Sequence, residues 1–285
     1  MPANIVLLFA NYEAAVQRDY EVICHMKGLK QRLYNGELLI GTFLSLGNAI
    51  TSEIVAGAGF DWVVIDLEHG LGMEGDVGLQ LLGLQQSGVS AIVRVEGFQR
   101  QRIHRVLDLG ADGIMCPRIE NAGDANLAIH AMQYPPQGTR GVAKMIRAAG
   151  YGSAFDSYYA SVREGLLGII QIETVEALKH LDAIAQIQGV DVLFIGPSDL
   201  SMALGIFGQT SHPLFIETVQ QIVRAADKAG KHTGILLSDP AEFARYHALG
   251  VRFMACGTDA GFLSKAARQT AGMLREAIVS LKKNH

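Results

Sequence analysis

Four kinds of reactive side chain stand directly after short apolar runs of this sequence. They are the run Asp66-Leu67-Glu68-His69, then Arg94, Glu173 and Asp199. Apolar runs such as Trp62-Val63-Val64-Ile65 predict buried strands. A charged residue at the end of a buried strand is typical of the active site of an α/β barrel. Two carboxylates, an arginine and a histidine in such positions indicate a metal-bound anionic substrate with a base beside it.

Glu173 and Asp199 are the candidate metal ligands. Each follows a predicted strand, and the two strands are consecutive, so their ends are expected to lie close together. Two oxygen ligands leave coordination positions for water and substrate, which suits Mg²⁺ or Mn²⁺ better than a closed zinc site. In the alternative interpretation, Glu173 caps the helix that begins at Thr174 and Asp199 caps the turn before Leu200.

His69 and Arg94 are the candidates for proton transfer and anion binding. His69 is flanked by Asp66 and Glu68, and a carboxylate partner can hold an imidazole ready as a base. A polar residue satisfied at a strand end is the alternative for His69. Arg94 ends the third predicted strand, where an arginine is costly unless it is paired. Its partner is either Glu68 or Glu173, or a substrate carboxylate that its planar fork binds with two hydrogen bonds.

Several other reaction classes lack the residues that they need. No predicted strand carries a lysine at its C-terminal end, which disfavours a Schiff-base mechanism. The sequence has no Gly-x-Ser-x-Gly elbow and no P-loop, and glycine-rich pieces such as Gly138-Thr139-Arg140-Gly141 do not form a dinucleotide fingerprint. The segment Gly196-Pro197-Ser198-Asp199 is either a turn whose backbone N–H groups meet an anion or a simple turn.

The elements that position these residues are eight apolar segments with helical patterns between them. A glycine ends the helix-like segment before several of them, as Gly59 and Gly189 do. Continuous apolar runs indicate strands buried on both faces, as in a parallel sheet. We predict strands at residues 38–46, 61–67, 90–95, 113–118, 166–172, 190–196, 232–238 and 252–257. Eight βα units predict a TIM (β/α)8 barrel of the α/β class, with a doubly wound open sheet as the alternative.

Two segments do not fit the repeat. Residues 1–36 are predicted to be an N-terminal helical extension ahead of a barrel domain at 37–285, with one helix from Tyr12 to Leu33 that closes the barrel bottom or contacts a second subunit. The connection from Tyr134 to Gly165 is longer than loops in compact domains usually are. We expect its basic residues to close over the site and to contact an acidic or polyhydroxy substrate, with a solvated loop or a subunit contact as the alternative. These basic residues are Arg140, Lys144 and Arg147.

The composition indicates a globular protein with a large core. The chain has 285 residues, of which 49% are hydrophobic and 18% charged, and its net charge is −4. The basic residues are scattered, which argues against nucleic acid as the main partner. The cysteines are Cys24, Cys116 and Cys256, without a Cys-x-x-Cys pair, and they suit a reducing compartment better than a disulfide framework. The run from Ile5 to Ala10 is too short to span a membrane and lacks the basic flank of a signal peptide, so we expect a soluble cytoplasmic protein.

Six motifs in order give the chain a family resemblance. They are Gly57-Ala58-Gly59-Phe60-Asp61-Trp62, Asp66-x-Glu68-His69, Val93-Arg94, Tyr134-Pro135-Pro136-x-Gly138-x-Arg140-Gly141, Gln171-Ile172-Glu173-Thr174 and Gly196-Pro197-Ser198-Asp199-Leu200-Ser201. From about residue 37 to 275 the chain resembles the HpcH/HpaI aldolases. The resemblance implies a metal-dependent class II pyruvate aldolase with a TIM-barrel fold.

The resemblance also implies roles for single residues at the catalytic centre. Glu173 and Asp199 would hold a divalent ion, which is Mg²⁺, Mn²⁺ or Co²⁺. Arg94 would bind pyruvate and its enolate oxygen. His69 would be the acid–base group, with Asp66 as its partner.

Further residues match positions around the substrate. Gly196, Pro197 and Ser198 would line the pyruvate site, and Leu236 would lie near the aldehyde. Asp108 matches a position that in relatives reaches the site of a neighbouring subunit. Family members are commonly hexamers that exchange their last helix, so the resemblance implies a homohexamer.

The implied reaction is the reversible cleavage of a 2-keto-4-hydroxy acid into pyruvate and an aldehyde. Its substrate would be a compound such as 4-hydroxy-2-oxoheptanedioate or a 2-keto-3-deoxy sugar acid. Leu67 and His69-Gly70-Leu71-Gly72 differ from the family pattern at the edge of the site, which leaves the aldehyde open. The alternatives are a lyase of the citrate lyase β or malyl-CoA type, and a non-catalytic barrel subunit.

Overall fold

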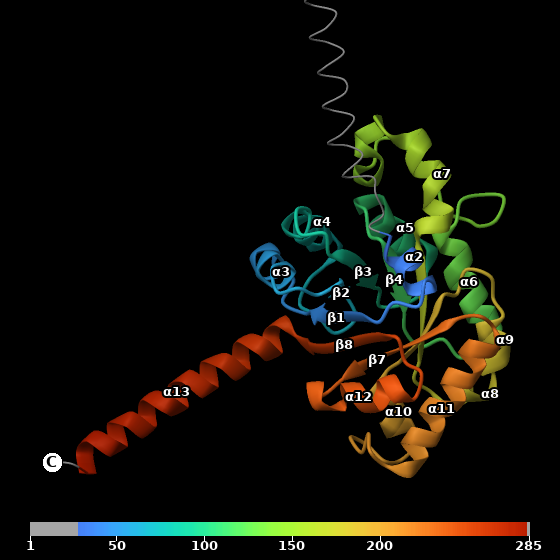
Figure 1. The fold of residues 1–285 in the computed structure, drawn as a ribbon. Coiled ribbons are helices and arrows are strands. Elements are labelled where there is room, and N and C mark those ends of the chain that lie inside the picture. The colour runs from blue at the N-terminus through green and yellow to red at the C-terminus, as the bar shows by residue number, and fades with distance from the viewer. Residues whose placement is uncertain (1–27, 284–285) are drawn as a thin grey trace, which may run out of the picture.

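The computed structural model describes residues 28–283 and contains a closed barrel of eight parallel strands (Figure 1). Each strand pairs with the next one in the chain, and β8 pairs with β1. The strands are β1 (Leu39–Leu44), β2 (Trp62–Asp66), β3 (Ser90–Arg94), β4 (Gly113–Cys116), β5 (Leu167–Ile172), β6 (Val192–Ile195), β7 (His232–Leu237) and β8 (Phe253–Thr258). The predicted TIM barrel is confirmed, and every predicted strand segment overlaps an observed strand.

The described residues form the following helices, most of which follow a strand and cover the outside of the barrel. They are α2 (Leu29–Tyr34), α3 (Ala49–Ala56), α4 (Glu74–Gly83), α5 (Arg100–Leu109), α6 (Ala122–Met132), α7 (Phe155–Gly165), α8 (Val175–Lys179), α9 (Leu181–Ala185), α10 (Pro197–Ala203), α11 (Pro213–Lys228), α12 (Phe243–Ala248) and α13 (Asp259–Lys283), with 3₁₀ turns η1 (Arg147–Gly152) and η2 (Pro240–Glu242). The helix α11 buries Phe215, Val219 and Ile222, which recur at helical spacing.

The lower barrel interior is filled by large aromatic rings. The Trp62 ring stacks on Phe253, with ring centroids 3.8 Å apart, and meets Phe194 edge-on at 6.4 Å. Gly41 makes room for this ring, because a Cβ at Gly41 would lie 2.3 Å from the indole. Phe43 packs above, 6.2 Å from Phe194. Burial of each of these side chains contributes roughly 1.5–3 kcal/mol to folding.

The helix α2 closes the barrel at the face where the strands begin. Leu29 and Leu33 are buried against the barrel interior. The Lys30 Nζ donates to the Leu166 carbonyl at 3.1 Å and pairs with Asp191 at 3.0 Å. The described end of the predicted N-terminal helix therefore plugs the barrel, and the remainder of that prediction lies outside the described residues.

The helix α13 leaves the body of the molecule. It extends away from the barrel in Figure 1, and only its first turns meet α3, β1 and β8. Nearly all of its side chains are exposed, including several large apolar ones. The exposed apolar residues are Phe262, Leu263, Met273, Leu274, Ile278, Val279 and Leu281. Within residues 28–283, no helix has the length and apolar composition that crossing a membrane requires.

Gly41→Ala is expected to destabilise the protein by about 1–3 kcal/mol, because the added methyl group overpacks the Trp62 layer. Denaturant unfolding of purified protein measures the change. The control is Gly78→Ala in the middle of α4, where the new Cβ would only touch Leu109 at an ordinary 3.6 Å. That variant should gain about 0.5–1 kcal/mol. If Gly41→Ala does not lower the free energy of unfolding relative to Gly78→Ala, this account of the barrel interior is contradicted.

Candidate active site

A buried ion pair lies where β2 and β3 end. Asp66 and Arg94 are partners in the register of these two strands. The Arg94 Nε and Nη2 donate to Asp66 Oδ1 and Oδ2 at 2.9 and 2.7 Å. Asp66 Oδ1 also accepts the backbone N–H groups of Glu68 at 3.0 Å and His69 at 3.2 Å. One carboxylate therefore holds the guanidinium and the turn that carries His69.

The remaining contacts fix the plane of the Arg94 guanidinium. Its Nη1 lies 3.0 Å from Glu68 Oε2 and donates to Gln171 Oε1 at 3.5 Å. The guanidinium carbon lies 5.2 Å from the centroid of the Phe43 ring, which forms the floor of the site. The sequence left Glu68, Glu173 or a substrate as the partner of Arg94. In the structure Arg94 pairs with Glu68 and also with Asp66.

Glu173 is held at the end of β5 by two hydrogen bonds. Its Oε1 accepts the Arg118 N–H and its Oε2 accepts the Gln171 amide, each at 2.7 Å. Arg118 has a φ of 54°, a conformation that non-glycine residues rarely adopt. It lies two residues after β4, and its N–H points at the Glu173 carboxylate. Thr174 caps the following helix α8, so the interpretation of Glu173 as a cap is wrong.

Gly196 and Asp199 follow β6, at the same end of the barrel as Glu173. Gly196 follows β6, and a Cβ there would lie 2.9 Å from Glu173 Oε2. A side chain at this position would therefore displace the Glu173 carboxylate. Asp199 lies in the first turn of α10, after Pro197, and Ser198 and Asp199 are exposed. Asp199 interacts favourably with the dipole of α10 from its first turn, but the N-cap of this helix is Gly196, and Asp199 does not cap it.

The carboxylates at the strand ends repel one another. Burial raises the pKa of Glu173, and the charges of Glu68 and Asp199 raise it further. Burial also raises the pKa of Glu68, against the opposing effect of Arg94. A hard divalent cation would relieve this repulsion, and an all-oxygen donor set fits Mg²⁺ or Mn²⁺. Among the described residues no three metal-ligating side chains converge on one point, so the metal prediction rests on Glu173 and Asp199.

His69 lies at the open edge of this group. Its side chain is 68% exposed, and its Nε2 lies 4.0 Å from Glu68 Oε2. Asp66 bonds the backbone of His69, and the carboxylate that faces the imidazole is Glu68. The ring is therefore accessible to a small molecule that also contacts Arg94.

Leu236 and Asp108 lie in different parts of the barrel. Leu236, on β7, packs on the upper barrel interior and is partly buried. Asp108 lies in the last turn of α5, which leads into the start of β4, and pairs with Arg140 at 2.7 Å. Asp108 is therefore at the opposite face of the barrel from Arg94.

The basic residues between α6 and β5 do not cover this site. Their segment connects a helix end to a strand start, so it lies at the face opposite the strand ends. The Arg147 Nη1 donates to the Leu109 carbonyl at 2.7 Å, and Lys144 lies 5.5 Å from the Phe155 ring. Arg140 is buried, so the prediction that these residues close over the chain's own site is wrong. A solvated loop does not describe Arg140 either.

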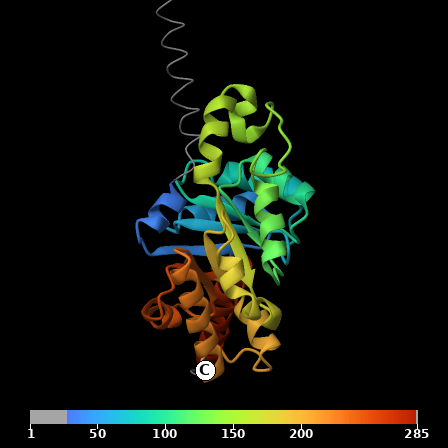
Figure 2. The same ribbon diagram turned by 90° about the vertical axis from the view of Figure 1, so that its right-hand side faces the viewer.

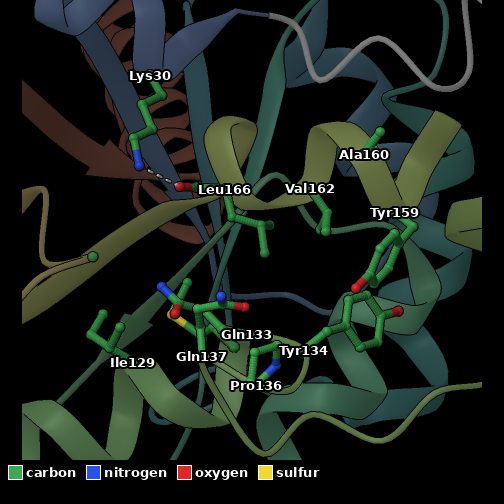
Figure 3. A pocket seen from close by; sticks show the side chains of 12 residues that line it. Lys30, Ile129, Gln133, Tyr134, Pro136, Gln137, Tyr159, Ala160, Val162 and Leu166 are labelled. Carbon is green, nitrogen blue, oxygen red and sulfur yellow. Dashed lines mark hydrogen bonds between the residues drawn. The ribbon is translucent and has the colours of Figure 1, made fainter.

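A cavity of about 330 Å³ lies at this same opposite face. Lys30, Tyr134, Pro136, Tyr159 and Leu166 line it (Figure 3). Leu166 directly precedes the first residue of β5, whereas Glu173 follows its last. The cavity is therefore separate from the strand-end group.

Three contributors to the site were not singled out from the sequence. Gln171 bridges Arg94 and Glu173, and its signal was a polar residue inside the apolar run from Leu167 to Ile172. Phe43 looks like any core residue of a strand. The left-handed Arg118 has no local sequence signal.

Comparisons with known proteins found similar sequences and similar folds. The family model for HpcH/HpaI aldolase/citrate lyase matches residues 39–266. The chain is 39% identical to a hydroxypyruvate/pyruvate aldolase of Paraburkholderia phytofirmans, covering 87% of this chain and 97% of that protein. It is 36% identical to the 5-keto-4-deoxy-D-glucarate aldolase of Escherichia coli K12, covering 87% and 96%. The solved structure of an HpcH/HpaI aldolase/citrate lyase family protein from Burkholderia cenocepacia superposes with a TM-score of 0.83 at 35% identity, covering 87% and 99%.

Proposed function

The chain belongs to the HpcH/HpaI aldolase/citrate lyase family and is a carbon–carbon lyase, and we propose that it is a metal-dependent class II pyruvate aldolase. It cleaves a 2-keto-4-hydroxy acid into pyruvate and an aldehyde and catalyses the reverse addition. The observation that carries the proposal is the Asp66-held guanidinium of Arg94 facing Glu68, Glu173 and Asp199 at the strand ends.

The relatives narrow the proposed substrate. Two of them are named for hydroxypyruvate/pyruvate and for 5-keto-4-deoxy-D-glucarate. These names favour a 2-keto-3-deoxy sugar acid over 4-hydroxy-2-oxoheptanedioate for this chain. They also favour an aldolase over a malyl-CoA-type lyase, because the citrate lyase structure from Burkholderia xenovorans is only 16% identical and supports the fold alone.

In the proposed mechanism, Glu173 and Asp199 would hold a divalent ion. The chemistry that such an ion supplies is Lewis-acid stabilisation of the pyruvate enolate. Asp66 holds the Nε and Nη2 of Arg94, so Nη1 is the nitrogen that orients the keto acid and offsets the charge that develops on its keto oxygen. His69 transfers the proton of the C4 hydroxyl, since its ring is exposed beside Glu68.

The walls of the site complete the proposal. Gly196, Pro197 and Ser198 line the side that receives pyruvate, where the absence of a Cβ on Gly196 keeps the space beside Glu173 open. Leu236 lies on the upper barrel interior and contacts the aldehyde half.

Chelation by EDTA is expected to abolish cleavage, and Mg²⁺, Mn²⁺ or Co²⁺ is expected to restore it, because two carboxylate ligands without the ion repel each other. Pyruvate release from a 2-keto-3-deoxy sugar acid, followed with a coupled assay, measures the activity. Treatment with pyruvate and borohydride is the companion experiment. A covalent pyruvate adduct trapped by borohydride would rule out the class II mechanism.

Arg94→Lys is expected to lower kcat/KM by about 10²-fold or more, because a point charge cannot replace a planar guanidinium that binds Asp66 through Nε and Nη2 while Nη1 meets the substrate. The matched control is Arg102→Lys on α5, whose partners Glu74 and Glu96 lie outside the site. Steady-state kinetics should leave the control near wild type. Equal kinetics for the two variants would make Arg94 a structural residue.

The same proposal includes a homo-oligomer, a hexamer by resemblance, in which α13 packs on a second copy. Leu263, Leu274, Ile278 and Leu281 recur at spacings that align them along one side of α13, and each is more than half exposed. A helix with an uncovered apolar stripe marks a protein interface.

Leu274→Asp is expected to dissociate the assembly, because it introduces a charge into the apolar stripe. Sedimentation velocity measures the mass of the particle. Gln269→Asp is the control, since its spacing aligns it with the opposite side of α13. A wild-type mass for Leu274→Asp would remove α13 from the interface.

A further inference from the structure

A buried carboxylate lies where β8 meets α13. Asp259 is the first residue of α13 and is 4% exposed. Its Oδ1 accepts the Ser45 N–H at 2.8 Å and the Ser45 hydroxyl at 2.9 Å. Its Oδ2 accepts the Leu46 N–H and the Thr51 hydroxyl, each at 3.2 Å. This one carboxylate therefore holds the loop that joins β1 to α3.

The carboxylate of Asp259 is fixed on both of its oxygens. Its Oδ1 also accepts the Ala260 N–H at 2.8 Å, in the first turn of α13, where the helix dipole favours a negative charge. Hydrogen bonds from N–H and O–H groups to a carboxylate are shorter and stronger than those between neutral groups. Asp259 therefore ties the start of α13 firmly to the loop after β1.

The loop after β1 in turn supports the loop that carries His69. The Ser45 carbonyl accepts the Leu71 N–H at 2.8 Å. The two loops also meet backbone to backbone, since a Cβ at Gly72 would lie 2.9 Å from the Gly47 Cα. Gly47 has a φ of 63°, in the region that favours glycine. The second half of the His69 loop therefore rests on the loop after β1.

His69 lies between two anchors of its loop. Before it, Asp66 accepts the His69 N–H at 3.2 Å. Two residues after it, Leu71 donates to the Ser45 carbonyl. The imidazole is 68% exposed, and its Nε2 lies 4.0 Å from Glu68 Oε2, beyond hydrogen-bond distance. The place of the imidazole therefore depends on the backbone of the loop.

The second anchor begins in the helix that leaves the barrel. Only the first turns of α13 meet α3, β1 and β8 among the described residues. Figures 1 and 2 show the C-terminal end of α13 at the end of the molecule opposite α7. Phe262, in the first turn, stacks on Phe60 with ring centroids 6.4 Å apart and packs the start of the helix against the barrel. The first turn of α13 is therefore the part of the helix that supports the loop after β1.

We propose that Asp259 is a positioning residue for the acid–base group, because it fixes, through Ser45, the loop that carries His69. The inference rests on the proposed aldolase function, in which His69 transfers the proton of the C4 hydroxyl. Arg94 and Glu173 are held by hydrogen bonds that involve neither Asp259 nor the loop after β1. Loss of the Asp259 carboxylate therefore misplaces His69 and leaves the binding of the keto acid intact.

Two reactions separate the placement of His69 from the rest of the site. Cleavage of a 2-keto-3-deoxy sugar acid breaks the C3–C4 bond, leaves its electron pair in the pyruvate enolate and requires removal of the C4 hydroxyl proton. Decarboxylation of oxaloacetate breaks the bond to its C4 carboxylate, releases CO₂ and forms the same enolate with no hydroxyl proton to remove. In both reactions the enolate then takes up a proton and becomes pyruvate. Both are followed with the Mn²⁺-loaded enzyme, above the rate given by Mn²⁺ alone.

Asp259→Asn should lower kcat for cleavage by about 10-fold or more with little change in KM, because a small misplacement of an acid–base group is sufficient. The amide brings an N–H donor to a place where the carboxylate accepts. Decarboxylation of oxaloacetate should stay within about two-fold of wild type, since it does not use His69. Added to His69→Asn, the change should cause no further loss of cleavage, because both changes damage one function.

Asp191→Asn is the matched control. Asp191 is 2% exposed and lies at the opposite face of the barrel, where it accepts hydrogen bonds from the Gly168 N–H and the Tyr34 hydroxyl. Its loss disturbs an equally buried carboxylate far from the His69 loop. Denaturant unfolding should show a lower stability, and any loss of activity should be the same in both reactions.

Gly72→Ala is the second variant, and it carries the test if Asp259→Asn does not fold. The new Cβ presses on Gly47 and moves the same loop without touching the carboxylate, so a selective loss of cleavage is expected again. Unchanged cleavage, equal losses in both reactions, or a further loss when Asp259→Asn is added to His69→Asn would overturn the inference. A wild-type enzyme that cleaves no 2-keto-3-deoxy sugar acid would overturn the proposed function instead.

Discussion

The ion pair between Asp66 and Arg94 is the constraint on which the rest of the site depends. The register of β2 and β3 brings the two residues together as soon as the sheet closes. Their side chains are 5% and 11% exposed, so loss of Arg94 would leave the buried carboxylate of Asp66 without its cation. Because Asp66 also accepts the backbone of His69, the same carboxylate sets the position of the candidate base.

The pair extends into a network that links the cationic and anionic halves of the site. Arg94 donates to Gln171, Gln171 donates to Glu173, and Glu173 accepts the Arg118 N–H. The barrel below it is apolar, with Phe43 directly under the guanidinium. In such surroundings electrostatic interactions are stronger than in water, and misplaced polar groups are more costly. The polar layer therefore has one well-defined arrangement at this end of the barrel.

The sequence was sufficient for the barrel and for the centre of the site. Continuous apolar runs marked all eight strands, and the charged residues after them, such as Arg94 and Glu173, lie together as expected. Contacts between residues far apart in the sequence could not be predicted from it. The conformation of Arg118 depends on contacts made after folding, and nothing near Arg140 in the sequence indicates that its partner is Asp108. The prediction that the loop closes over the site was wrong because a connection from a helix end to a strand start lies at the barrel face opposite the strand ends.

The missing Cβ of Gly196 has a consequence for how this enzyme can change over time. A larger residue there would press on the Glu173 side chain, so substitution at Gly196 is constrained. Leu71, in contrast, lies in the loop after β2, two residues beyond His69, and is 79% exposed. Under the proposed function, sequence change in that loop alters which aldehyde is accepted while the residues around Glu173 are kept. The barrel places the constrained position and the exposed position on separate loops, after β6 and after β2.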